Sequence, residues 1–160
     1  MKQNVALVIC GSGEFGAFIC KQLASDGMLV AVNYLSNKES ADRVVNQITN
    51  NGGKAMAFQG DTENSQNIEK LFLEISRTLG PVDVFVSNSD IEFPMQPFKK
   101  IKWNESSLKI NDKLTSVFDI TKKLVNTIRI GSFGKINHIS HESEKCTFLQ
   151  LQLVGLLKES

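Results

Sequence analysis

The chain has 160 residues, of which 41% are hydrophobic and 22% charged, and a formal net charge of +1 at pH 7. This balance is typical of one soluble globular domain with a buried core, so we expect residues 1–160 to form a single domain. There is no block of like charge and no apolar run near the roughly 20 residues of a membrane span, which argues against nucleic-acid and membrane partners. Strand-forming residues begin at residue 5, leaving no room for a signal peptide, and a cytoplasmic location is expected.

The first pattern is an apolar run that breaks into glycines at residues 11–16, Gly-Ser-Gly-Glu-Phe-Gly, and continues with apolar residues at helical spacing. This order predicts a strand, a tight turn and a helix. Such a turn lets the backbone approach a pyrophosphate, while the N–H groups that open the helix supply positive potential. Glycine-rich turns also form for steric reasons, so the pattern alone is weak evidence of a phosphate cradle.

Strand and helix patterns then alternate. In chain order they predict a strand over 28–34, a helix over 41–48, a strand over 54–59, a helix over 68–79 and a strand over 82–86. Gly52-Gly53 and Gly80-Pro81 follow the two helices, as glycine and proline commonly do at helix ends.

A long amphipathic helix is predicted over 112–130, after a polar loop that contains proline. Its core-facing side is expected to carry the apolar residues Leu114, Val117, Phe118, Leu124, Val125 and Ile128. A fifth strand is expected over 135–140, and a last apolar segment, 148–157, predicts a short helix.

Five such alternations predict an α/β fold of the Rossmann type: a doubly wound parallel sheet of about five strands with helices on both faces. Ligands of these sheets bind at the carboxyl ends of the strands, beside the switch in strand order. The glycine turn at 11–16 is predicted to lie at that place.

Several stretches carry a family resemblance. They are Ile-Cys-Lys-Gln-Leu-Ala-Ser-Asp-Gly at 19–27, Gly-Gly-Lys-Ala at 52–55 with Gly-Asp at 60–61, Gly-Pro-Val-Asp-Val-Phe-Val at 80–86, Leu-Thr-Ser-Val-Phe at 114–118 and Lys-Ile-Asn-His-Ile-Ser at 135–140. Together they resemble the short-chain dehydrogenase/reductase family, most closely its NADP-dependent acetoacetyl-CoA and 3-oxoacyl-[acyl-carrier-protein] reductases. In that family two more strands follow the fifth, so the resemblance implies a C-terminally truncated domain.

The resemblance implies NADP(H) as the cofactor. The residues expected to contact it are Gly11, Ser12, Gly13, Phe15, Gly16, Tyr34, Ser36, Asn37, Lys38, Asp61, Thr62 and Asn88. The stretch 33–38 offers no Asp or Glu to the ribose hydroxyls, which favours NADP over NAD. Ser36 and Asn37 can donate to a 2′-phosphate and Lys38 can neutralise it, while Asp61 resembles the family's adenine contact.

Two departures bear on this cofactor. The glycine turn is one residue shorter than the family's pattern and places Glu14 at the start of the helix. Ser-Asn-Ser-Asp at 87–90 replaces the family's Asn-Asn-Ala-Gly. Each change brings a carboxylate toward the expected pyrophosphate, so weak or absent binding is an open alternative.

The family's reductases use a tyrosine, a lysine, a serine and an asparagine. The single tyrosine of this chain, Tyr34, falls near the expected adenosine ribose and cannot serve as their acid. The positions matching the tyrosine, lysine, serine and asparagine hold Cys146, Gln150, His141 and Lys113. We therefore predict no catalytic residue, and a chemical role for these four replacements stays open.

No metal site is predicted. Cys10, Cys20 and Cys146 lack metal-ligand spacing, and reduced, mostly buried thiols are expected.

Three functions fit these patterns. The first is a catalytically inactive nucleotide-binding protein of this family; the second is an active NADPH-dependent 3-oxoacyl-CoA/ACP reductase. The third is a non-functional remnant, or a structural partner of a full-length reductase.

An oligomer is expected because the strand at 135–140 ends the sheet as a bare edge, and because Ile120, Thr127 and Ile130 lie off the sheet-facing side of the predicted helix. In the family the corresponding helix lies in a dimer interface. We expect a homodimer, or a heteromer with a full-length relative.

Overall fold

The computed structural model describes residues 3–62 and 65–87, short runs between 102 and 122, and the backbone of 134–142 and 145–153. Its elements follow in the order β1 (Val5–Ile9), α1 (Glu14–Ser25), β2 (Leu29–Tyr34), α2 (Lys38–Asn50), β3 (Lys54–Gln59), α3 (Ser65–Thr78), β4 (Val82–Ser87), β5 (Gly134–Glu142) and β6 (Lys145–Leu153). None of the described helices is long and apolar enough to cross a membrane.

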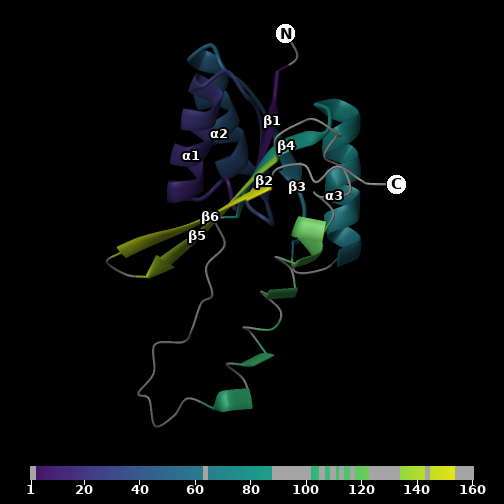
Figure 1. Ribbon diagram of the computed structural model, residues 1–160. Coiled ribbons are helices and arrows are strands. Elements are labelled where there is room, and N and C mark those ends of the chain that lie inside the picture. Colours follow the sequence, from purple (N-terminus) through teal and green to yellow (C-terminus); the bar gives the residue numbers. More distant parts are fainter. Residues whose placement is uncertain are drawn as a thin grey trace.

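The described strands form one six-stranded sheet in the order β3-β2-β1-β4-β5-β6. Strands β1 to β5 pair in parallel, and Leu7 of β1 lies between Ala31 of β2 and Phe85 of β4. The chain builds outward from β1 in both directions, with α1 and α2 on one face of the sheet and α3 on the other (Figure 1). The predicted Rossmann-type α/β fold is confirmed.

Strand β1 lies at the centre of the sheet and is buried along its whole length. Its residues alternate between the two faces: Leu7 packs in the cluster that includes α3, and Val8 packs in the cluster that includes α1 and α2. Strands buried on both faces are expected to be continuously apolar, which explains the run that opens the chain.

The helix ends lie near the predicted positions because of local chemistry. Asn37 precedes α2, and its side-chain oxygen accepts a hydrogen bond from the Ser40 N–H at 2.9 Å. Gly52 and Gly80, which follow α2 and α3, have φ values of +81° and +112°, a conformation that other residues rarely adopt.

The prediction of a helix over 148–157 is wrong where the structure describes it. Residues 148–153 belong to β6, which pairs antiparallel with β5, and 154–157 lie outside the described residues. The sequence Leu-Gln-Leu-Gln-Leu at 149–153 alternates with period two, which is the pattern of a strand. The expectation that the fifth strand is a bare edge is also wrong, because β6 covers it.

The orientation predicted for the helix at 112–130 is wrong as well. Its described residues, 114–115 and 118–122, are helical. Ile120 is only 2% exposed and packs in the α3-side core, whereas Leu114 and Phe118 are 61% and 66% exposed. Apolar residues occur on both sides of this segment, so helical spacing alone does not define the core side. The other residues named for it, Val117, Leu124, Val125, Thr127, Ile128 and Ile130, lie outside the described residues.

Candidate functional site

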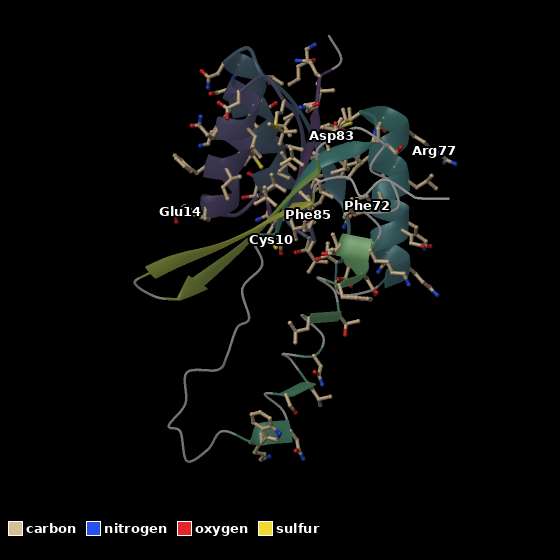
Figure 2. All side chains as sticks on the ribbon, in the orientation of Figure 1. Cys10, Glu14, Phe72, Arg77, Asp83 and Phe85 are labelled. Atoms are coloured by element: carbon tan, nitrogen blue, oxygen red, sulfur yellow. The ribbon has the colours of Figure 1, made fainter. Side chains whose placement is uncertain are left out.

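The candidate site lies where the carboxyl ends of β1, β2 and β3 meet. Cys10, which precedes the glycine turn, and Glu14, which lies within it, are at the end of the sheet opposite Asp83 (Figure 2). Backbone hydrogen bonds join the loops there: Gly11 N–H donates to the Asn33 carbonyl at 2.9 Å, and Gly60 N–H donates to the Tyr34 carbonyl at 3.0 Å. Three loops from separate strands therefore share one edge of the sheet.

The glycine turn follows β1 directly and leads into α1. Cys10 has a φ of +52°, and Gly13 N–H donates back to the Cys10 carbonyl at 3.1 Å. Gly13 is the N-cap of α1 and makes no side-chain cap, so the first helical residue is Glu14. The positive end of the α1 dipole thus faces the turn, as a phosphate cradle requires.

Packing requires glycine at position 16 of this turn and leaves little room for a side chain at position 11. A Cβ on Gly16 would lie 2.3 Å from the Cys10 carbonyl oxygen, and one on Gly11 would lie 3.0 Å from Cys20 Sγ. Gly13 differs from both, because the nearest atom to its Cβ would be the Cys10 carbonyl oxygen at 3.4 Å and its φ is −74°. Packing and φ at position 13 therefore leave room for a small side chain, although glycine is itself favoured at an N-cap.

The side chain of Asn33 in β2 forms hydrogen bonds with the chain segments at the carboxyl ends of β1 and β3. It is only 2% exposed, and its amide nitrogen donates to the Gly60 carbonyl at 3.0 Å and to the Phe58 carbonyl at 3.4 Å. Its amide oxygen accepts from the Cys10 N–H at 3.5 Å. Asn33 is not among the residues predicted from the sequence. Its signal there is a polar residue in the otherwise apolar run of β2.

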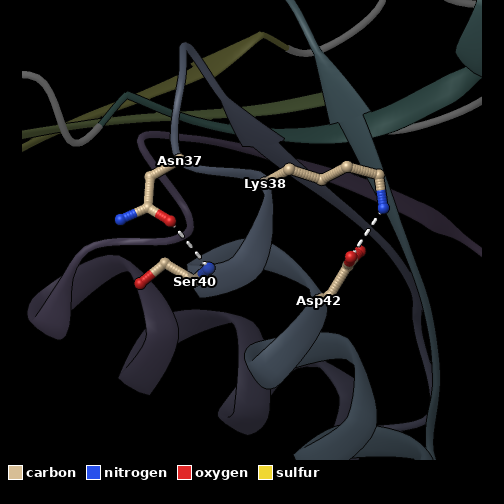
Figure 3. A network of polar contacts seen from close by, with 4 residues as sticks. All are labelled: Asn37, Lys38, Ser40 and Asp42. Carbon is tan, nitrogen blue, oxygen red and sulfur yellow. Dashed lines mark hydrogen bonds and ion pairs between the residues drawn. The ribbon is translucent and has the colours of Figure 1, made fainter.

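The start of α2 carries the predicted 2′-phosphate group of residues. Ser36, Asn37 and Lys38 are all exposed. Lys38 Nζ lies 2.6 Å from Asp42 Oδ2, one helical turn further along (Figure 3). The hydrogen bond to Asp42 raises the pKa of Lys38 above its ordinary value, so the ammonium is charged. The sequence analysis predicts Lys38 but not its partner Asp42.

The remaining predicted contacts have different surroundings. Tyr34 is buried and packs in the cluster of the α1–α2 face. Ser12 and Phe15 of the turn, and Asp61 and Thr62 after β3, are partly exposed. Asn88 and Lys113 lie outside the described residues.

The positions that match the family's catalytic residues fall on a hairpin. The pairing of β5 with β6 places His141 opposite Cys146 and Asn137 opposite Gln150. The backbone of both Cys146 and Gln150 belongs to strand β6.

The two described cysteines differ in environment. Cys20 is buried, its Sγ lies 3.8 Å from the Gly11 carbonyl oxygen, and burial raises the pKa of its thiol to about 12. Cys10 is exposed, so the expectation of a buried thiol is wrong there because the turn carries it away from the core. Among the described residues no group of three His, Cys, Asp or Glu residues could hold a metal ion.

The sequence matches the short-chain dehydrogenase family over residues 4–150, which is most of the chain. The chain therefore belongs to that family, whose members bind NAD(P). It is 32% identical over 140 residues to nodulation protein G of Azospirillum brasilense and 28% identical over 140 residues to an acetoacetyl-CoA reductase of Cupriavidus necator.

The alignment with each of these two proteins covers 88% of this chain and 56% of the relative, so the chain spans about half their length. Among solved structures it resembles a short-chain dehydrogenase/reductase from Serratia marcescens, with a TM-score of 0.73 and 26% identity. That match covers 86% of this chain and 55% of the other.

Proposed function

We propose that residues 1–160 form one Rossmann-type domain that binds NADP(H) and does not catalyse reduction of 3-oxoacyl thioesters. The observation that carries the proposal is the turn at Gly13. Its missing side chain leaves open backbone at the amino end of α1, where a pyrophosphate would need close approach.

The adenosine end supports NADP rather than NAD. No acidic residue follows β2 through residue 38, so nothing there repels a 2′-phosphate or pairs with the ribose hydroxyls of NAD. Lys38 supplies a positive charge at the start of α2, and Ser36 and Asn37 are exposed beside it. We assign these three residues to the 2′-phosphate.

The absence of activity is inferred from the family's chemistry. The single tyrosine of this chain, Tyr34, lies at the end of β2 and is buried there. A positioned general acid typically contributes about 10²- to 10⁴-fold to a rate. Without that tyrosine and its lysine, a bound NADPH has no matched proton donor for a ketone.

Association with a second chain, a copy or a full-length relative, is part of the proposal. Leu114 and Phe118 lie four residues apart, and both are exposed. Apolar side chains exposed together on a helix commonly mark a contact surface. We place the protein in the cytoplasm with this partner.

Thermal melts and a reductase assay test the function together. We expect NADP+ to raise the melting temperature of the purified chain, and we expect no oxidation of NADPH with acetoacetyl-CoA. Turnover that is lost on changing Cys146 or His141 would favour an active reductase. A melting temperature that neither nucleotide changes would favour a remnant without nucleotide binding.

A further inference from the structure

Lys38 and Asp42 form an ion pair along the first turn of α2, with 2.6 Å between Nζ and Oδ2 (Figure 3). Both side chains are solvent accessible, with 68% of Lys38 and 45% of Asp42 exposed. Exposed pairs at this spacing are weak, so an anion of higher charge can take Lys38 away from Asp42. The Asp42 carboxylate nevertheless remains about one helical turn from an anion that binds Lys38.

The polar groups next to Lys38 already have hydrogen-bond partners within the protein. The Ser40 N–H, which would otherwise face an anion at the start of the helix, donates to Asn37 Oδ1 at 2.9 Å. Arg43 Nη2 donates to Ser40 Oγ at 3.0 Å. Lys38 is the first basic residue after β2 in the sequence, and its ammonium is paired with Asp42.

We propose that Asp42 sets the preference between NADP and NAD, because its carboxylate competes with the 2′-phosphate for Lys38. This inference rests on the proposed binding of NADP(H). NAD+ carries no 2′-phosphate to compete for Lys38, so we expect the charge of Asp42 to have little effect on the binding of NAD+. The present sequence thus favours NADP less strongly than Lys38 alone would.

The test compares Asp42→Asn with Glu39→Gln. Each change removes one negative charge near the start of α2 and keeps the side chain's size. Glu39 is exposed in the first turn, three residues before Asp42, whereas Asp42 is the residue paired with Lys38. Calorimetric titrations with NADP+ and NAD+ at low and at physiological ionic strength give the affinity of each variant for both nucleotides.

We expect Asp42→Asn to bind NADP+ roughly 3- to 10-fold more tightly than wild type, the size of one screened charge interaction near a dianion. Its affinity for NAD+ should stay within about twofold, and the gain for NADP+ should shrink with salt. Glu39→Gln should change either affinity by less than about twofold. In a Lys38→Gln background Asp42→Asn should give a smaller gain, because the competition for Lys38 is gone.

Three results would overturn the inference while leaving the proposed function intact. They are an equal effect of Asp42→Asn on both nucleotides, an equal effect of Glu39→Gln and Asp42→Asn on NADP+, or an unchanged gain without Lys38. Wild-type protein that binds neither nucleotide would overturn the proposed function and this inference with it. Melting curves of the variants check that all of them are folded.

Discussion

Helix α1 touches the glycine turn at Gly16, where an added Cβ would lie 2.3 Å from the carbonyl oxygen of Cys10. This is closer than any side chain allows, so the contact between the helix and the turn is made by backbone alone. The contact fixes the direction in which the amino end of α1 points, and with it the position of the proposed phosphate cradle.

Gly16→Ala and Gly13→Ala should therefore act on different properties. We expect Gly16→Ala to lower the free energy of unfolding by about 1–3 kcal/mol, because the turn must move to admit the methyl group. Gly13→Ala has no clash to relieve, and its effect on stability should be below about 1 kcal/mol. Its affinity for NADP+ should nevertheless fall, since the methyl group occupies the open face of the turn.

Urea denaturation and calorimetric titration measure these two effects separately. If Gly13→Ala binds NADP+ as tightly as wild type, the nucleotide does not approach the turn at this position. If Gly16→Ala is as stable as wild type, the close contact with Cys10 does not constrain the turn.

Asn33 should be important for stability although it lies in an apolar strand. Asn33→Leu leaves the Gly60 carbonyl and the Cys10 N–H without this side-chain partner, and an unsatisfied buried polar group costs about 1–3 kcal/mol. Asn46→Leu, on the exposed side of α2, is the matched control and should change stability by less than about 0.5 kcal/mol. Equal unfolding midpoints in urea for the two variants would contradict this role of Asn33.

The buried thiol of Cys20 predicts a loss of stability at high pH. Burial raises its pKa from 9.0 to about 12 in the folded protein, so the unfolded state releases its proton first. The stabilisation is complete below pH 9 and is lost as the pH rises toward 12, by an amount on the order of a few kcal/mol. Comparing wild type with Cys20→Ala across this range isolates the effect, and identical pH slopes for the two proteins would contradict it.

Substitutions of Ile120 and Phe118 should have opposite effects on stability, because only Ile120 packs in the α3-side core. Ile120→Ala should cost about 2–4 kcal/mol because Ile120 is buried, whereas Phe118→Lys should leave the fold stable because Phe118 is exposed. If this surface mediates association, Phe118→Lys should shift the wild-type oligomer to monomer in light scattering. A monomeric wild type, or an oligomer that Phe118→Lys does not change, would exclude the proposed contact.

The elements best predicted from the sequence are those with clear local signals at both ends. Strand β3 lies at the predicted residues 54–59, between the glycines at 53 and 60. The hairpin at the end of the sheet is not predicted from the sequence, because the apolar segment 148–157 is interpreted as a helix although residues 149–153 alternate with period two. The burial of Ile120 depends on which face of its helix packs against the α3-side core. Local sequence spacing does not determine this tertiary contact.

The candidate site was predictable to a similar degree. The glycine turn and Lys38 were found because their patterns are contiguous in the sequence. The pairing of Asp42 with Lys38 could also be predicted, since a carboxylate four residues after a lysine on a helix commonly pairs with it. The role of Asn33 depends on three strands meeting at one edge, and no local pattern predicts which carbonyls its side chain contacts.

Calorimetric titration of the wild-type chain with NADP+ and NAD+ tests the central claim most directly. We predict saturable binding of one NADP+ per chain, tighter than the binding of NAD+, because Lys38 meets a 2′-phosphate that NAD+ lacks. No saturable binding of either nucleotide, or tighter binding of NAD+ than of NADP+, would contradict it.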